Sequence, residues 1–153
     1  MNSLVKKKIG DVIIFEDNDL NIINGTFRGM DIDAKRIENP NTETIQFLDQ
    51  LTKCHHPNVQ RIFKYEVDRD RYYLVKELCT SNLVDYINNT KKNVKRTKKT
   101  RMIPILKDIT NGLKYLHDNG ILHKNINPKN ILVDLNKSAK LCNIGINEIN
   151  KKK

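Results

Sequence analysis

The sequence predicts an α+β fold, because strand patterns dominate its first half and helical spacing dominates its second. Residues 1–79 hold five short β-rich stretches separated by polar turns, and one stretch with helical spacing. Residues 80–153 hold the strongest helical pattern of the chain, followed by two short strand patterns. We therefore expect a five-stranded antiparallel sheet with one helix in residues 1–79, joined to a partial helical region in residues 80–153. The total of 153 residues suits one ordinary domain.

The expected strands are short β-branched runs or alternate polar and apolar residues. Asp31–Ile37 alternates most clearly, and Gly29 can supply the positive φ that a hairpin turn before it requires. Tyr72–Val75 follows a charged turn at Asp68–Arg71. The strands of the first half are expected at residues 11–15, 20–27, 31–37, 59–63 and 72–75, and those of the second half at residues 130–133 and 139–142.

Helical spacing occurs in three places. Residues 42–53 carry apolar residues at this spacing after the break at Pro40. Residues 83–87 form a short helical pattern, for which Asn82 is a suitable N-cap. Residues 102–117 form the longest pattern, and we expect its apolar face to lack a partner in this chain. That face consists of Met102, Leu106, Ile109, Leu113 and Leu116.

The charge of the chain is strongly uneven. It carries 28 Lys and Arg against 18 Asp and Glu, a net charge of +10, yet residues 1–79 hold 12 basic and 13 acidic residues. A basic region can bind nucleic acid, but a lysine-rich composition also places lysine on any solvated surface. No aromatic residue interleaves with the basic run, so only phosphate attraction would be available to it. RNA binding therefore stays an alternative, through Lys91, Lys92, Lys95, Arg96, Lys98, Lys99 and Arg101.

Cysteine usage and hydropathy indicate a cellular setting. Cys54, Cys79 and Cys142 are odd in number and widely spaced, which fits neither a disulfide framework nor a zinc site. No apolar run approaches the length of a membrane span. We expect an intracellular, cytoplasmic protein without a membrane association.

Four segments occur in the order and spacing of a protein kinase: Ile32–Lys35, Glu77–Cys79, His123–Asn130 and Asn143–Gly145. On these segments the chain resembles protein kinases over nearly its whole length. It is most similar to the unfolded-protein-response sensor kinase/endoribonucleases and ribonuclease L, with further pointers at residues 25–29 and 56–59. The resemblance implies an N-lobe at residues 1–79, and a hinge with a truncated C-lobe at residues 80–153 that ends just after the metal-binding motif.

The resemblance gives residues of the N-lobe nucleotide-binding roles. Lys35 corresponds to the lysine that holds the α- and β-phosphates, and Gln46 to the helix glutamate that pairs with it, with Glu43 as an alternative. Glu77 and Cys79 correspond to the hinge that contacts adenine. Lys76 just before the hinge replaces a residue that is usually apolar, at the back of the adenine pocket. A buried ammonium there needs an acidic partner, for which Glu77 or Asp134 would be suitable.

The catalytic motifs depart from the family pattern. The catalytic aspartate is Asn125, and a carboxamide is not a useful base near neutral pH. The lysine that steadies the γ-phosphate is Asn127. The metal-binding asparagine is retained as Asn130, but the metal-binding aspartate is Asn143, so Mg²⁺ loses its charged ligand. His123 corresponds to a structural residue that braces this loop.

The loop that should cover the phosphates, residues 15–21, contains no glycine. Its carboxylates Glu16, Asp17 and Asp19 would repel phosphates. We therefore expect an inactive pseudokinase that binds ATP and Mg²⁺ weakly at most. We expect it to act by binding a protein, for which a full-length kinase is a candidate. Two alternatives stay open beside the RNA-binding module: a low-activity serine/threonine kinase, and an incomplete gene product.

Overall fold

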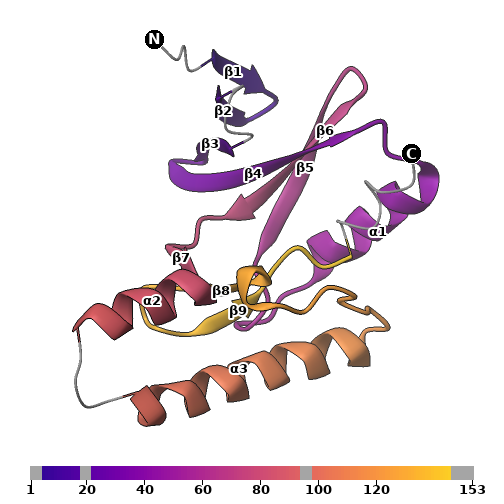
Figure 1. Cartoon of the computed structure of the whole chain (residues 1–153). Helices are drawn as coiled ribbons and strands as arrows, with labels where there is room; N and C mark the ends of the chain where they lie inside the picture. The colour runs from indigo at the N-terminus through magenta and orange to yellow at the C-terminus, as the bar shows by residue number, and fades with distance from the viewer. Residues whose placement is uncertain (1–4, 18–21, 94–97, 146–153) are drawn as a thin grey trace. The chain divides into compact units, whose positions relative to one another are not determined.

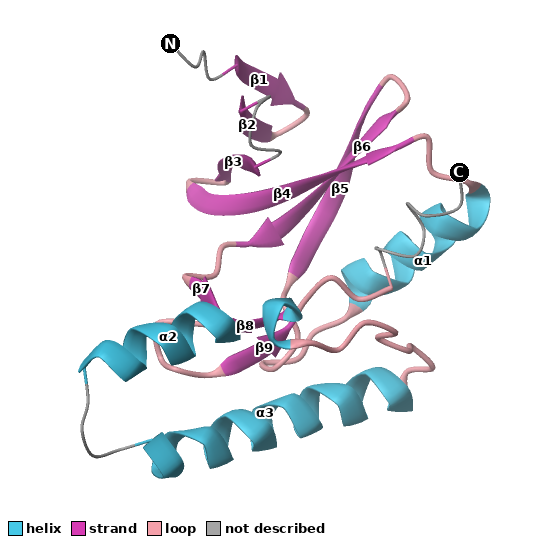
Figure 2. Ribbon diagram, in the orientation of Figure 1, coloured by secondary structure: helices cyan, strands magenta, loops and turns pink. Residues whose placement is uncertain are grey.

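The computed structural model describes residues 5–17, 22–93 and 98–145 of the chain. The chain divides into two compact units (Figure 1). The first contains the residues up to Cys54 together with Arg61–Leu78, and the second contains His55–Gln60 and the residues from Cys79 onward. Strands dominate the first unit and helices outweigh strands in the second, so the expected α+β fold class is confirmed (Figure 2).

The first unit is built on a six-stranded antiparallel sheet with the strand order β1-β2-β3-β4-β6-β5. It has one strand more than expected, because three consecutive lysines hide the strand pattern of β1, which pairs with β2 across a turn at Gly10. The expected strand at residues 59–63 begins later, at Ile62. The strands are β1 (Val5–Ile9), β2 (Val12–Asp17), β3 (Ile22–Phe27), β4 (Met30–Glu38), β5 (Ile62–Asp68) and β6 (Arg71–Glu77).

The inner face of this curled sheet carries the apolar core of the unit. Gly25 in β3 lies so close to β2 that a Cβ would collide with the carbonyl oxygen of Ile13, which explains a glycine in mid-strand. Phe63 packs against the core and its ring lies 5.7 Å from that of Phe27. The core residues are Ile9, Val12, Ile14, Ile23, Phe27, Ile32, Ala34, Tyr73 and Val75.

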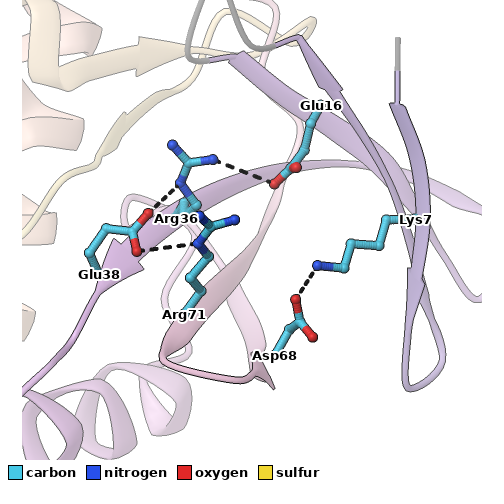
Figure 3. Close-up of polar contacts among 6 residues, drawn as sticks. All are labelled: Lys7, Glu16, Arg36, Glu38, Asp68 and Arg71. Carbon is cyan, nitrogen blue, oxygen red and sulfur yellow. Dashed lines mark hydrogen bonds and ion pairs between the residues drawn. The ribbon is translucent and has the colours of Figure 1, made fainter.

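One end of the same inner face is charged (Figure 3). Arg36 lies 3.8 Å from Glu16 and 2.8 Å from Glu38, while Lys7 and Asp68 form an ion pair that links β1 to β5. Glu16 is buried on this face, away from Lys35, because Arg36 and Lys35 alternate along β4. Glu16 therefore does not face Lys35, and Arg36 lies beside its carboxylate. Asp19 and the rest of the loop between β2 and β3, residues 18–21, lie outside the described residues.

Helix α1 (Thr42–Lys53) has the expected bounds. The side chain of Asn41 caps it by accepting a hydrogen bond from the backbone N–H of Thr44 at 2.8 Å. Its buried residues are Thr44, Leu48 and Leu51, which recur at helical spacing.

The second unit combines helices α2 (Leu83–Asn93) and α3 (Lys98–Asp118) with a small sheet. Its three strands are β7 (Ser81–Asn82), β8 (Ile131–Val133) and β9 (Ala139–Leu141), and a short 3₁₀ helix η1 (Pro128–Asn130) precedes β8. Among the described residues, no helix combines the length and hydropathy that a bilayer crossing demands.

Asn82 caps α2 as expected, since its side-chain oxygen accepts a hydrogen bond from the N–H of Asp85 at 3.0 Å. Helix α3 packs against β9, but the buried stripe differs from the expected face. Leu116 and Ile105 are buried, whereas Leu106, expected in the apolar face, is 56% exposed. Gly112 completes the buried stripe, where a Cβ would lie 2.5 Å from the carbonyl oxygen of Asn58.

Candidate functional site

The first group of candidate residues lies on β4 and β6, on the outer face of the sheet. Lys35 is half-buried there, and its register partner on β6 is Leu74. Asp33, two residues earlier on the same face, lies directly opposite Lys76. The Lys76 ammonium lies 2.9 Å from the Asp33 carboxylate, and Lys76 is only 7% exposed.

Lys76 therefore has the acidic partner that its burial requires, but this partner is Asp33 and not Glu77 or Asp134. The sequence reasoning missed Asp33. Two signals could have found it: the alternation that places Asp33 on the face of Lys35, and the antiparallel pairing of the two strands.

Helix α1 carries the two candidate partners of Lys35. Gln46 and Glu43 are both exposed, on sides of the helix other than the buried one. The buried side carries Thr44, whose hydroxyl donates to the Asn41 side chain at 2.7 Å. Pairing of Gln46 with Lys35 stays a prediction.

The hinge residues lie at the boundary of the two units. The N–H of Glu77 donates to the carbonyl oxygen of Arg61 at 2.9 Å, and its carboxylate accepts from the N–H of Arg61 at 2.7 Å. These bonds fasten Glu77 to the start of β5. Cys79 begins the longer of the two segments that form the second unit and is half-buried, and no disulfide joins any of the three cysteines in the described part of the chain. Contact of Glu77 and Cys79 with adenine stays a prediction.

The structure brings four candidate residues of the second unit together, here called the asparagine cluster: Asn125, Asn127, Asn130 and Asn143. The amide of Asn143 donates to the side-chain oxygen of Asn130 at 3.0 Å. The amide of Asn130 donates to the backbone carbonyl of Asn125 at 2.9 Å. The amide of Asn127 donates to the side-chain oxygen of Asn125 at 2.9 Å. Hydrogen bonds therefore link the four residues, two of them between side chains and one from the Asn130 amide to the backbone of Asn125.

This cluster does not fit the Mg²⁺ that the kinase resemblance implies. Mg²⁺ prefers carboxylate and phosphate oxygens, and the cluster offers only neutral amides. The side-chain oxygen of Asn130, which would be the retained metal ligand, already accepts the proton of Asn143. No group of three or more His, Cys, Asp or Glu side chains with metal-binding geometry occurs in the part of the chain that the structure describes.

Asn127 also has a structural role in the loop. Its side-chain oxygen accepts from the N–H of Lys129 at 2.9 Å and so caps η1. With its amide bonded to Asn125, Asn127 uses both ends of its side chain to hold the loop. An amide has no positive charge with which to steady a γ-phosphate.

His123 is buried beside the same loop and forms hydrogen bonds to it. Its ring is 1% exposed, its Nδ1 accepts from the N–H of Asn125 at 3.3 Å, and its carbonyl accepts from the N–H of Gly145 at 3.0 Å. Burial lowers the pKa of His123, so the imidazole is neutral at pH 7. Lys124, which follows His123, and Asn143, in the segment that contains Gly145, have positive φ angles of 63° and 56°. These bonds hold both segments in a backbone conformation that L-residues rarely adopt.

The structure does not describe the side chains of the basic run. Residues 94–97 are not described, and the side chains of residues 90–101 are not described either. RNA binding through this run stays a prediction.

Comparison with known proteins gives a consistent result. The protein kinase domain family matches residues 30–153. Serine/threonine-protein kinase TOS3 of Saccharomyces cerevisiae is 29% identical over 118 residues, which cover 72% of this chain and 21% of the yeast protein. Serine/threonine-protein kinase/endoribonuclease ire-1 of Caenorhabditis elegans is 33% identical over 119 residues, which cover 74% and 12%. The IRE1 kinase/endoribonuclease of Hypocrea jecorina is 32% identical over 126 residues, which cover 76% and 10%.

These similarities confirm the resemblance to protein kinases and to the kinase/endoribonucleases among them. The chain spans about a fifth or less of the length of these relatives.

The asparagine cluster predicts that one substitution creates a cation site. Asn143→Asp replaces an amide donor with a carboxylate and releases the side-chain oxygen of Asn130, so we expect Mn²⁺ to bind at least about tenfold more tightly. Isothermal titration with MnCl₂ measures this. The control is Asn111→Asp, the same change at an exposed position of α3. Equal Mn²⁺ affinities of the two variants would contradict the assignment.

The burial of His123 predicts a pH dependence of stability. Its folded pKa is lowered from an unfolded value of about 6.5, so the unfolded chain binds more protons just below that pH. The contribution of His123 to the free energy of unfolding is full above about pH 6.5 and decreases as the pH falls toward the folded pKa. Urea midpoints of the wild type and of His123→Gln, compared between about pH 7.5 and about pH 5.5, measure it.

We expect the midpoint of the wild type to fall more steeply on acidification than that of His123→Gln. The matched control is His117→Gln, because His117 is exposed at the end of α3. The explanation fails if His123→Gln keeps the full wild-type pH dependence.

Proposed function

Because the chain belongs to the protein kinase family, we propose that it is a pseudokinase, a catalytically inactive member that acts by binding another protein. The observation that carries the proposal is the asparagine cluster. Its residues stand where the family resemblance expects a base, a phosphate-steadying lysine and a metal carboxylate, and hydrogen bonds join the four residues to one another.

The chemistry of phosphoryl transfer explains why this arrangement argues against turnover. Catalysis by kinases depends almost entirely on positioning and on electrostatic stabilisation of the transferred group. A positioned general base alone contributes about 10²–10⁴-fold, and Asn125 has no basic atom at neutral pH. Without Asp at position 143, the charge that holds Mg²⁺ against the phosphates is also missing. These losses act on the same transition state.

A second candidate function is a low-activity serine/threonine kinase. The relatives named above are serine/threonine kinases, and Lys35 and Asn130 are retained. The bond from Asn143 to Asn130 favours the inactive form, because it uses the oxygen that a metal ion would need.

A phosphate-transfer assay distinguishes these functions. The full chain is incubated with γ-labelled ATP, with Mg²⁺ or Mn²⁺, and with a generic serine- and threonine-containing protein. We expect no labelling above that of a Lys35→Ala variant, since the base and the metal carboxylate are absent. Labelling of the acceptor that Lys35→Ala abolishes would overturn the pseudokinase proposal and establish the second candidate.

The proposal of a protein partner is supported by the apolar surface of α3. Ile103 and Leu106 are 68% and 56% exposed, and Leu122 and Ile126 in the following loop are 59% and 52% exposed. A partner that covered these side chains would remove their apolar surface from water, which is favourable. The partner we propose is a full-length kinase of the same family.

Sedimentation velocity of the chain mixed with such a kinase tests this partner. We expect a complex that Leu106→Asp weakens by at least about tenfold, because a carboxylate would be buried without a partner in the interface. Asn111→Asp introduces the same charge at an exposed polar position of α3 and should leave the complex intact. Absence of a complex, or equal effects of the two variants, would contradict this part of the proposal.

A further inference from the structure

We propose that the Asp33–Lys76 ion pair excludes adenine nucleotides from the face of the sheet that carries Lys35. This inference rests on the proposed function and assigns to two residues the exclusion of the nucleotide. It concerns only the first unit, because Asp33, Lys35 and Lys76 all belong to β4 or β6.

The register of β4 and β6 fixes where the pair lies. Lys35 is opposite Leu74, Asp33 is opposite Lys76, and Ile32 is opposite Glu77. The ion pair therefore lies between Lys35 and the Glu77 end of β6, on the same face as Lys35. A nucleotide with its phosphates on Lys35 and its base toward Glu77 must place the base or the ribose over this pair.

The pair makes this part of the face polar. The Lys76 side chain is 9% exposed and the Asp33 side chain is 34% exposed, with 2.9 Å between the ammonium and the carboxylate. A purine gains from stacking on apolar or aromatic surface. A purine that stacks here presents its ring face, which carries no N–H donor, so it would strip water from the partly exposed carboxylate of Asp33 without a compensating hydrogen bond.

Asp33 also lowers the positive potential that phosphates need. Its carboxylate is two residues from Lys35 on the same face of β4, so its negative charge acts on the phosphates that Lys35 would attract. Each charge of the pair compensates the other in its partly buried position. Without Asp33, the buried ammonium of Lys76 would be uncompensated, and such single removals are strongly destabilising.

The test therefore removes both charges together. The double variant Asp33→Ala/Lys76→Leu replaces the pair with small and apolar side chains, and calorimetry measures binding of ATP and of adenosine to the full chain without a divalent cation. We expect no binding of either ligand to the wild type at millimolar concentration. We expect the double variant to bind both ligands with dissociation constants at least about tenfold below that millimolar limit. Adding Lys35→Ala to the double variant should weaken ATP but not adenosine.

A matched control comes from the same two strands. Glu38 lies opposite Arg71 in the register of β4 and β6, and the two side chains form an ion pair of 3.4 Å on the inner face. Glu38→Ala/Arg71→Leu removes this pair and should gain no affinity for ATP or adenosine. Circular dichroism confirms that each variant is folded. If Asp33→Ala/Lys76→Leu is unfolded, Asp33→Asn/Lys76→Met removes the same charges with closer shapes and carries the same expectation.

The outcomes separate this inference from the proposed function. Submillimolar binding of ATP to the wild type without phosphate transfer would overturn the exclusion and leave the pseudokinase proposal standing. Transfer of labelled phosphate by the wild type would overturn both. Equal affinities of the wild type and a folded double variant, or an equal gain in the Glu38→Ala/Arg71→Leu control, would also overturn the role of Asp33 and Lys76.

Discussion

The antiparallel pairing of β4 with β6 sets the positions on which the first unit depends. Its register places Ala34 opposite Val75 in the inner core and Asp33 opposite Lys76 on the outer face. Because side chains alternate between the faces of a strand, a slip of one residue would exchange the two sets. Lys35 would then point into the apolar core and Ala34 to the outer face. The apolar core thus fixes the register, and the register brings the charged residues together.

The asparagine cluster shows a second constraint, which concerns how a polar loop is held. An amide both donates and accepts, whereas a carboxylate at neutral pH only accepts. A carboxylate at position 143 could not donate to Asn130 as the amide of Asn143 does, whereas the side chain of Asn125 only accepts in its bond with Asn127. With amides, the loop is held by internal hydrogen bonds, together with buried His123. The loop therefore keeps its conformation without any ligand.

Local signals predicted the parts of the fold in which neighbouring residues decide the structure. Helix α1 followed from the break at Pro40 and the spacing of its apolar residues, and β4 followed from its alternation. Strand β1 was not predictable, because Lys6–Lys8 give no strand pattern and the strand depends on pairing with β2. The burial of Ile105 and Gly112 on α3, in place of Leu106, depends on packing against distant segments.

The candidate site divides in the same way. Motif spacing placed all members of the asparagine cluster, since they lie within two short segments. Their hydrogen bonds to one another required the structure. The partner of Lys76 could not be read from the motifs, because Asp33 is 43 positions away in the sequence and meets it only through strand pairing. Glu16 points to the inner face because its register partner Ile23 lies in the core.

The ion pair of Lys7 and Asp68 affects how readily a strand of another molecule can add to the sheet. It connects β1 with β5, the two strands at the ends of the strand order. In a flat sheet, both of these strands would present open backbone N–H and C=O groups, to which a strand of another molecule could add. Here the curvature turns each terminal strand toward the other, and the lysine and the aspartate fasten them together. Fibrillar growth by strand addition is thereby discouraged in a chain rich in isoleucine and asparagine.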